Sequence, residues 1–158
     1  MRRAAGVAAL LVTVALLAAT GLMVGQQRRT QAEEHARAEF AAAARQAVIS
    51  LMSIDYTDPE DSVRRIVDNS TDPFRAEFQS ATDDFIKVSR DAKVTTTVTA
   101  DAAAVRSMTG DSAVVLVAAS STVTPADGTA EPPRSWRLSV DLRRDGDQIK
   151  MSNVEFVG

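Results

Sequence analysis

The segment Trp136–Val157 reads WRLSVDLRRDGDQIKMSNVEFV and has the clearest strand-and-turn pattern in the C-terminal half of the chain. Large apolar residues alternate with polar or charged ones from Trp136 to Leu142, as in a strand with one buried face. The pair Asp145-Gly146 favours a tight turn. A second strand is expected from Ile149 to Val157, so the segment predicts an antiparallel β-hairpin.

The same alternation continues toward the N-terminus. It runs through Val94–Ala100, more weakly through Ala103–Met108, and then, after a turn at Thr109-Gly110-Asp111, through Ala113–Thr122. Together with the hairpin these segments predict a four-stranded antiparallel meander, in which the weak Ala103–Met108 segment is not counted as a strand of its own; a loop at residues 125–133 interrupts the meander. The run Ala113–Ala119 is apolar on both faces, which favours a central strand buried within the domain over a strand that meets a partner.

Helical patterns fill the first half of the chain. Residues 26–56 are alanine-rich and free of Gly and Pro, and they predict one continuous helix. Its early part lacks large apolar residues, so residues 26–39 are expected to form a stalk. An apolar stripe begins at Phe40, and the soluble domain is therefore placed at residues 40–158.

Two further helices are predicted by Asp-Pro pairs, because aspartate caps a helix and proline suits its first turn. One begins at Asp58-Pro59 and ends near Asn69. The other begins at Asp72-Pro73. Its expected apolar face consists of Phe74, Phe78, Ala81 and Phe85. Helices followed by a meander define an α+β domain.

The segment Ala4–Gly25 contains no charged residue, Asn or Gln. As a helix it would be about 33 Å long, enough to cross a hydrocarbon core of about 30 Å. Residues 1–25 are therefore interpreted as a short N-terminal tip and a transmembrane helix; this length favours an anchor over a cleaved signal peptide. Arg2 and Arg3 favour a cytoplasmic N-terminus, which places the domain on the extracytoplasmic side of the plasma membrane.

Gly21 and Gly25 form a G-x-x-x-G pair within the predicted span. This spacing lets a second membrane helix approach closely, and the pair is a candidate helix interface. Ordinary glycine enrichment in membrane helices explains it equally well.

Composition excludes several functions. The chain has 18 basic and 21 acidic residues, interleaved rather than clustered, which argues against nucleic-acid binding. It has no cysteine, so disulfides, thiolate metal sites and cysteine nucleophiles are absent.

No catalytic, cofactor or metal site is predicted. The single histidine, His35, lies on the stalk with no triad partner. Asp55-Tyr56 could pair a base with a phenol, but neighbours on a helix diverge by about 100°, so structural roles are favoured. Asp55 is expected to bond a nearby arginine, with Arg64 and Arg65 as candidates, or a backbone N–H. Trp136 on its alternating face is interpreted as core rather than a binding hot spot.

Several stretches together resemble the Mce-associated membrane proteins of mycobacteria and related actinobacteria. They follow an N-terminal anchor and an Ala-rich helix, and are AVISLMSIDY at Ala47–Tyr56, SVRRIVDNSTDPF at Ser62–Phe74, and the terminal Trp136–Val157 segment. Asp72-Pro73 departs from the pattern, where a glycine is expected before the phenylalanine.

The resemblance implies a cone-shaped domain of helices and a curved sheet, of the NTF2-like and VirB8-like type. It also implies an accessory or assembly subunit of an Mce lipid-import complex, with Mce transporter subunits or other envelope proteins as partners; lipid contact and homo-oligomerisation are compatible with that role. The resemblance implies no catalytic residue in this chain. The structural or interface candidates are Gly21, Gly25, Asp55, Tyr56, Arg64, Phe74 and Trp136.

Two alternatives remain open. Cone-shaped folds often enclose an apolar pocket, so the domain could bind a small hydrophobic ligand or be an enzyme. A VirB8-like component of a secretion channel would have the same topology.

Overall fold

The computed structural model describes residues 30–157. The chain divides into two compact units, Met1–Ala36 and Arg37–Gly158. In the first unit, residues 30–36 are helical. The predicted membrane segment, with Gly21 and Gly25, lies outside the described residues. Among residues 30–157, no helix is long and apolar enough to span a membrane.

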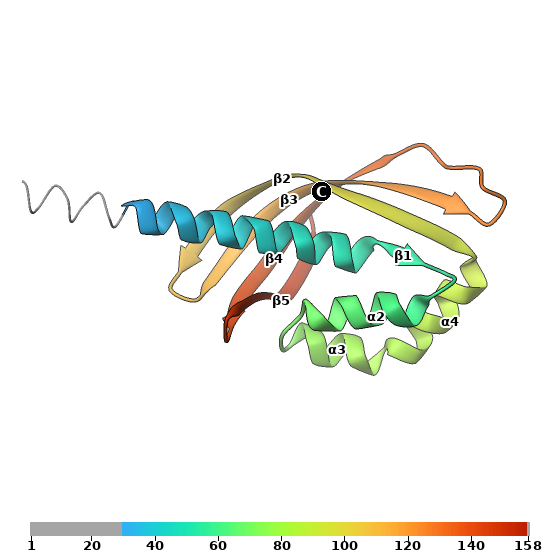
Figure 1. Ribbon diagram of the computed structural model, residues 1–158, viewed down its shortest axis with the longest axis horizontal. Coiled ribbons are helices and arrows are strands. Elements are labelled where there is room, and N and C mark those ends of the chain that lie inside the picture. Colours follow the sequence, from blue (N-terminus) through green and yellow to red (C-terminus); the bar gives the residue numbers. More distant parts are fainter. Residues whose placement is uncertain (1–29, 158) are drawn as a thin grey trace, which may run out of the picture. The chain divides into compact units, whose positions relative to one another are not determined.

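The second unit is an α+β domain, as predicted. Residues 37–52 form its first helix, and the elements that follow are β1 (Ile54–Asp55), α2 (Pro59–Asp68), α3 (Phe74–Ser80), α4 (Thr82–Ala92), β2 (Val94–Thr109), β3 (Ser112–Pro125), β4 (Arg134–Asp145) and β5 (Gln148–Phe156). The strands form one antiparallel sheet in the order β1-β2-β3-β4-β5. The helices follow one another on a single side of this sheet (Figure 1).

The core lies between the helix at residues 37–52 and the sheet. Phe40, Ala44, Ala47 and Val48 pack against inward residues of β2 to β5. The inward-facing side chains of the central strands β3 and β4 are fully buried. They are Val115, Val117, Leu138, Val140 and Leu142. We call this side of the sheet the covered face.

The predicted terminal hairpin is confirmed. β4 and β5 pair from Leu138 with Phe156 to Asp145 with Gln148, and Gly146 in the turn has a φ of 61°. A positive φ costs glycine little because it has no Cβ, which is why Asp-Gly is a strong turn signal. The hairpin before it also turns where expected, at Gly110 with a φ of 52°.

The sheet has five strands, and the prediction of four was wrong. The additional strand is β1, two residues that pair with Thr95 and Thr96 of β2. The two alternating segments expected at 94–100 and 103–108 are one strand, because bulges at Asp101 and Arg106 absorb the breaks in the alternation without ending the pairing with β3.

The helix expected to reach Tyr56 ends at residue 52. Its last backbone hydrogen bond runs from the Ser53 N–H to the Ile49 carbonyl. Beyond it, the Asp55 carboxylate accepts the Thr57 N–H at 2.9 Å, which is a local turn rather than a helix. Strand pairing and this turn outweigh the helical periodicity of the segment.

The third predicted helix is two helices. α3 ends at Ser80, α4 begins at Thr82, and the break falls at Ala81. On either side of it, hydroxyls bond back to carbonyls: Ser80 Oγ to Glu77 at 2.7 Å and Thr82 Oγ1 to Phe78 at 3.2 Å. Such bonds compete with the backbone ladder and favour a bend.

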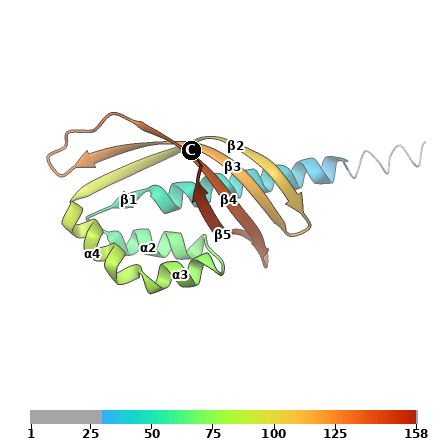
Figure 2. The ribbon, with the colours of Figure 1, turned by 180° about the vertical axis from the view of Figure 1, so that it is seen from behind.

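β3 is covered on one face only, so the expectation that its apolar run is buried on both sides was wrong. Leu116 is 40% exposed and Ala118 is also exposed. No described helix covers this side, which faces the viewer in Figure 2. We call it the bare face; Ala102 and Ala104 of β2 and Arg137 of β4 also lie on it.

Candidate functional site

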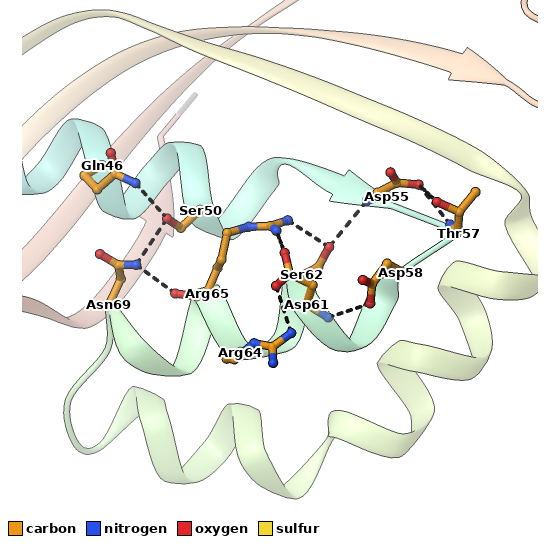
Figure 3. Close-up of polar contacts among 10 residues, drawn as sticks. All are labelled: Gln46, Ser50, Asp55, Thr57, Asp58, Asp61, Ser62, Arg64, Arg65 and Asn69. Atoms are coloured by element: carbon orange, nitrogen blue, oxygen red, sulfur yellow. Dashed lines mark hydrogen bonds and ion pairs between the residues drawn. The ribbon is translucent and has the colours of Figure 1, made fainter.

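Polar side chains gather where β1, α2 and the end of the helix at residues 37–52 meet (Figure 3). α2 begins there as predicted, with Pro59 in its first turn and the Asp58 carboxylate accepting the Asp61 N–H at 3.0 Å. Asp61 in turn pairs with Arg64 at 2.8 Å and with Arg65. Acids in the first turn complement the helix dipole, so this end of α2 is stabilised locally.

Ser62 joins α2 to β1. Its side chain is fully buried, and its Oγ accepts the backbone N–H of Asp55 at 3.4 Å and Nη2 of Arg65 at 3.1 Å. A hydroxyl is small enough to fit at this crossing and can accept both donors. Ser62 therefore couples the start of the sheet to the first helix of the α2–α4 group.

Ser50 and Asn69 join the other end of α2 to the helix at residues 37–52. Ser50 Oγ accepts Nδ2 of Asn69 and Nε2 of Gln46, each at 3.3 Å. Asn69 Nδ2 also donates to the Arg65 carbonyl at 2.8 Å, closing the C-terminus of α2. We call the whole group the polar clasp: Gln46, Ser50, Asp55, Ser62, Arg65 and Asn69.

The buried side-chain atoms of the polar clasp all have hydrogen-bond partners. In the described part of the chain, no buried side-chain nitrogen or oxygen lacks a partner. The Thr57 hydroxyl donates to the Asp55 carboxylate at 2.7 Å, and this bond, with the Thr57 N–H, holds the pKa of Asp55 below its ordinary value; Arg65 contributes in the same direction. Asp55 is thus an anion that stabilises a turn, and its lowered pKa is opposite to that needed by a general acid near neutral pH.

An apolar groove lies beside the polar clasp, between β1, the start of β2 and the α3–α4 pair. Its volume is about 420 Å³, and Asp84 is the one charged residue that lines it. The rest of the lining is Ile54, Phe78, Ala81, Phe85, Val88, Ser89, Ala92, Val94 and Thr96. We call it the aromatic groove. Val88 on its wall is 65% exposed, so an apolar side chain or ligand could be buried there.

Three half-buried phenylalanines support this wall. Phe74 and Phe78 stack with their ring centroids 6.0 Å apart, and Phe78 meets Phe85 edge to face at 5.4 Å. The common face predicted for them survives the break at Ala81. α3 itself has no fully buried residue, but Phe74 packs against the hydrophobic core and Phe78 contacts Phe85 of α4.

The candidate residues predicted from the sequence do not converge on one site. Asp55 lies in β1 and in the polar clasp, followed by the half-buried Tyr56. Arg64 is exposed on α2 and bonds to Asp61. Phe74 stacks on Phe78 and packs against the hydrophobic core. Trp136 packs on β4 against Phe156 at 5.7 Å, and its Nε1 donates to Ser121 Oγ at 2.7 Å.

Sequence reasoning missed Ser50, Ser62 and Asn69 as structural residues. Each lies within a stretch quoted for the family resemblance, but small polar residues are common on helices and give no periodic signal. A usable signal was available for Ser62: it lies on the same helix face as Ile66, four residues on, and a serine on a buried stripe needs a partner.

No group of three or more His, Cys, Asp or Glu residues within 30–157 is arranged to hold a metal ion. The arrangement is a hydrogen-bonded polar network beside an apolar groove, and an apolar groove of this kind can accommodate apolar groups of another molecule.

The fold is that of the VirB8-like and NTF2-like proteins. An IcmL-like type IV secretion system protein from Legionella pneumophila superposes with a TM-score of 0.63 and 10% identity over 77% of this chain and 91% of that one. CagV, a VirB8 homologue from Helicobacter pylori, gives 0.60 and 11% identity over 75% and 96%. The periplasmic domain of DotI gives 0.61 and 15% identity over 74% and 91%. At these identities the likeness concerns the fold alone.

The chain belongs to the family described as "Uncharacterized protein Rv1363c/MT1408-like", whose model matches residues 2–158. It is 43% identical over 150 residues to the uncharacterized protein Rv1363c of Mycobacterium tuberculosis (strain ATCC 25618 / H37Rv). The match covers 95% of this chain and 58% of that relative, so the chain spans less than two thirds of the relative's length.

Proposed function

We propose that this chain is a non-catalytic accessory subunit of a cell-envelope complex, and in particular of an Mce-type lipid-import complex. In this proposal residues 4–25 anchor it in the plasma membrane as a single pass, with the N-terminus in the cytoplasm and the domain outside. It stabilises or links transporter components through protein–protein contacts.

The observation that carries the proposal is the contrast between the polar clasp and the aromatic groove. Every buried polar side-chain atom of the described residues has a hydrogen-bond partner, so the role that we assign to the polar clasp is structural. The groove, in contrast, leaves Val88 exposed and is lined by the half-buried Phe78 and Phe85. An apolar groove with one carboxylate at its wall fits apolar side chains of a partner subunit.

Two alternatives have support of their own. The fold shared with CagV and the IcmL-like protein favours a component of a secretion channel. The volume of the aromatic groove favours a small hydrophobic ligand instead. The first alternative predicts that secretion-channel proteins bind to the purified protein, and the second predicts a bound hydrophobic ligand. One experiment therefore distinguishes them.

The experiment is affinity purification of the tagged full-length chain from native membranes in mild detergent, with mass spectrometry of the bound proteins and lipids. Recovery of Mce transporter subunits is expected. Recovery of secretion-channel components would favour the VirB8-like alternative, and recovery of a bound lipid without protein partners would favour the ligand-binding one. Either of these results contradicts the Mce proposal.

A matched pair of variants tests the aromatic groove as the contact. Val88→Glu places a charge on the groove wall, and we expect the recovered partner to fall at least about fivefold because burying an unpaired carboxylate is costly. Lys87→Glu introduces the same side chain at the neighbouring position, which does not line the groove. Equal recovery with both variants would place the contact elsewhere.

A further inference from the structure

The bare face of the sheet has a knob and a hollow side by side. Leu116 projects from β3, and the register places it directly opposite Ala104 of β2. Around it lies a depression of about 370 Å³, whose lining includes Ala102, Ala104, Ala118 and Val157. The alanines leave the space empty because each has only a methyl group, while Leu116 is large enough to fill such a space in another molecule.

Opposite charges flank this depression. Asp101 occupies the bulge next to Ala102 at the β2 edge, and Ser120 Oγ donates to its carboxylate at 3.3 Å, which keeps the carboxylate on the bare face. Arg137 lies on the other side, on β4 opposite Ala118. Within residues 30–157, no ion pair is formed by Arg137 or by Asp101.

We propose that the bare face binds the same face of a second copy of this chain. A two-fold axis parallel to the strands and between β2 and β3 places each Leu116 over Ala104 of the partner subunit. The same rotation carries Arg137 of the partner subunit to the β2 edge, where Asp101 lies. The interface therefore contains the knob-and-hollow contact twice and the ion pair twice, as an isologous dimer requires.

Charge complementarity selects this occupant. An acyl chain would fill the apolar depression but would leave both charges beside it without a counterpart. An unrelated protein would need its own matching knob, hollow and pair of charges. A second copy has all of them by symmetry, since each sits at the position that the rotation demands.

The absence of cysteine from the chain makes a direct test straightforward. In the full-length protein in detergent micelles, Ala118→Cys is treated with a bifunctional maleimide whose spacer is about 10 Å, the separation of two packed sheets. We expect efficient cross-linking to a covalent dimer. The control is Val88→Cys, an exposed position on α4 away from the bare face. Equal cross-linking of the two variants, or none with Ala118→Cys, would overturn the proposal.

Charge reversal tests the geometry of the dimer. In the Ala118→Cys background, Asp101→Lys and Arg137→Asp each replace two attractive pairs by two repulsive ones, and we expect dimer affinity to fall roughly tenfold. The double variant restores opposite charges across the interface and should restore most of the cross-linking. Unchanged circular dichroism of all three shows that they are folded. Failure of the double variant to recover would overturn the proposed two-fold arrangement.

This inference does not depend on the proposed transport role. The cross-linking is measured on the purified chain, whereas the Mce proposal is measured by the proteins recovered from membranes. Either proposal can therefore be contradicted while the other stands.

Discussion

On β3, Val115 and Val117 face the helices and are buried, whereas Leu116 and Ala118 face the opposite way and are exposed. The residues are of similar kind, and only their surroundings differ. On the covered face, apolar packing and the polar clasp leave no buried polar side chain of the described part without a partner. On the bare face, apolar area and charges lie open together. We conclude that the covered face determines stability and that the bare face is available for association.

The largest expected effect compares two leucines. Leu138→Ala removes a fully buried side chain from the covered face, and we expect the free energy of unfolding to fall by about 2–5 kcal/mol because a cavity is left. Leu116→Ala removes the same atoms from the bare face and should cost under about 1 kcal/mol. Urea unfolding of the two full-length variants, at a protein concentration low enough to keep them monomeric, measures both. Similar losses would remove the distinction between the faces.

The next largest expected change in the free energy of unfolding compares two serines. Ser62→Ala leaves the Asp55 N–H and the Arg65 guanidinium without their acceptor, at an expected cost of about 1–3 kcal/mol. Ser120→Ala removes a hydroxyl that bonds to Asp101 on the bare face, where water can replace it, and should change stability by under about 0.5 kcal/mol. The same unfolding measurement applies. A neutral Ser62→Ala would mean that the polar clasp does not hold α2 in place.

A third comparison uses two aspartates. Asp58→Ala removes the N-cap of α2, and we expect a loss of about 1 kcal/mol. Asp101→Ala, at a bulge of the bare face, should leave the unfolding midpoint nearly unchanged while reducing cross-linking through Ala118→Cys. If Asp101→Ala destabilises the monomer as much as Asp58→Ala does, the carboxylate of Asp101 is a structural group and the dimer argument is weakened.

Local signals in the sequence predicted the elements that depend on local chemistry. The Asp-Gly turn at Gly146, the alternation of β4 and the Asp58 cap were all correct, because a turn residue or a cap acts over four residues. The end of the first helix was not predicted. It depends on the pairing of Ile54 with Thr96, far along the chain, which overrides the helical pattern.

The candidate site was predicted less well, for the same reason. Arg64 and Arg65 were the arginines predicted as partners of Asp55, and of the two only Arg65 acts on it, through its charge. The hydrogen bonds of Asp55 instead join its carboxylate to Thr57 and its N–H to Ser62, through a strand and a turn that were expected to be helix. The apolar run of β3 was recognised correctly. Its pattern cannot reveal whether the second face is covered by the chain itself, because burial and a binding surface select the same residues.

The smallest expected effect is a dependence on pH. Folding lowers the pKa of Asp55 from its ordinary value of 3.8, mainly through the Thr57 hydroxyl and N–H, so the folded chain binds this proton less readily than the unfolded chain. The resulting stabilisation is present above about pH 4 and is lost as the pH falls through the lowered pKa.

The variant Asp55→Asn tests this dependence because it removes the titrating group. The difference in urea midpoint between the unaltered chain and Asp55→Asn should therefore be constant near neutral pH and shrink below about pH 4. A difference for Asp55→Asn that stays constant down to pH 2 would show that the turn at Thr57 does not depend on the charge of Asp55.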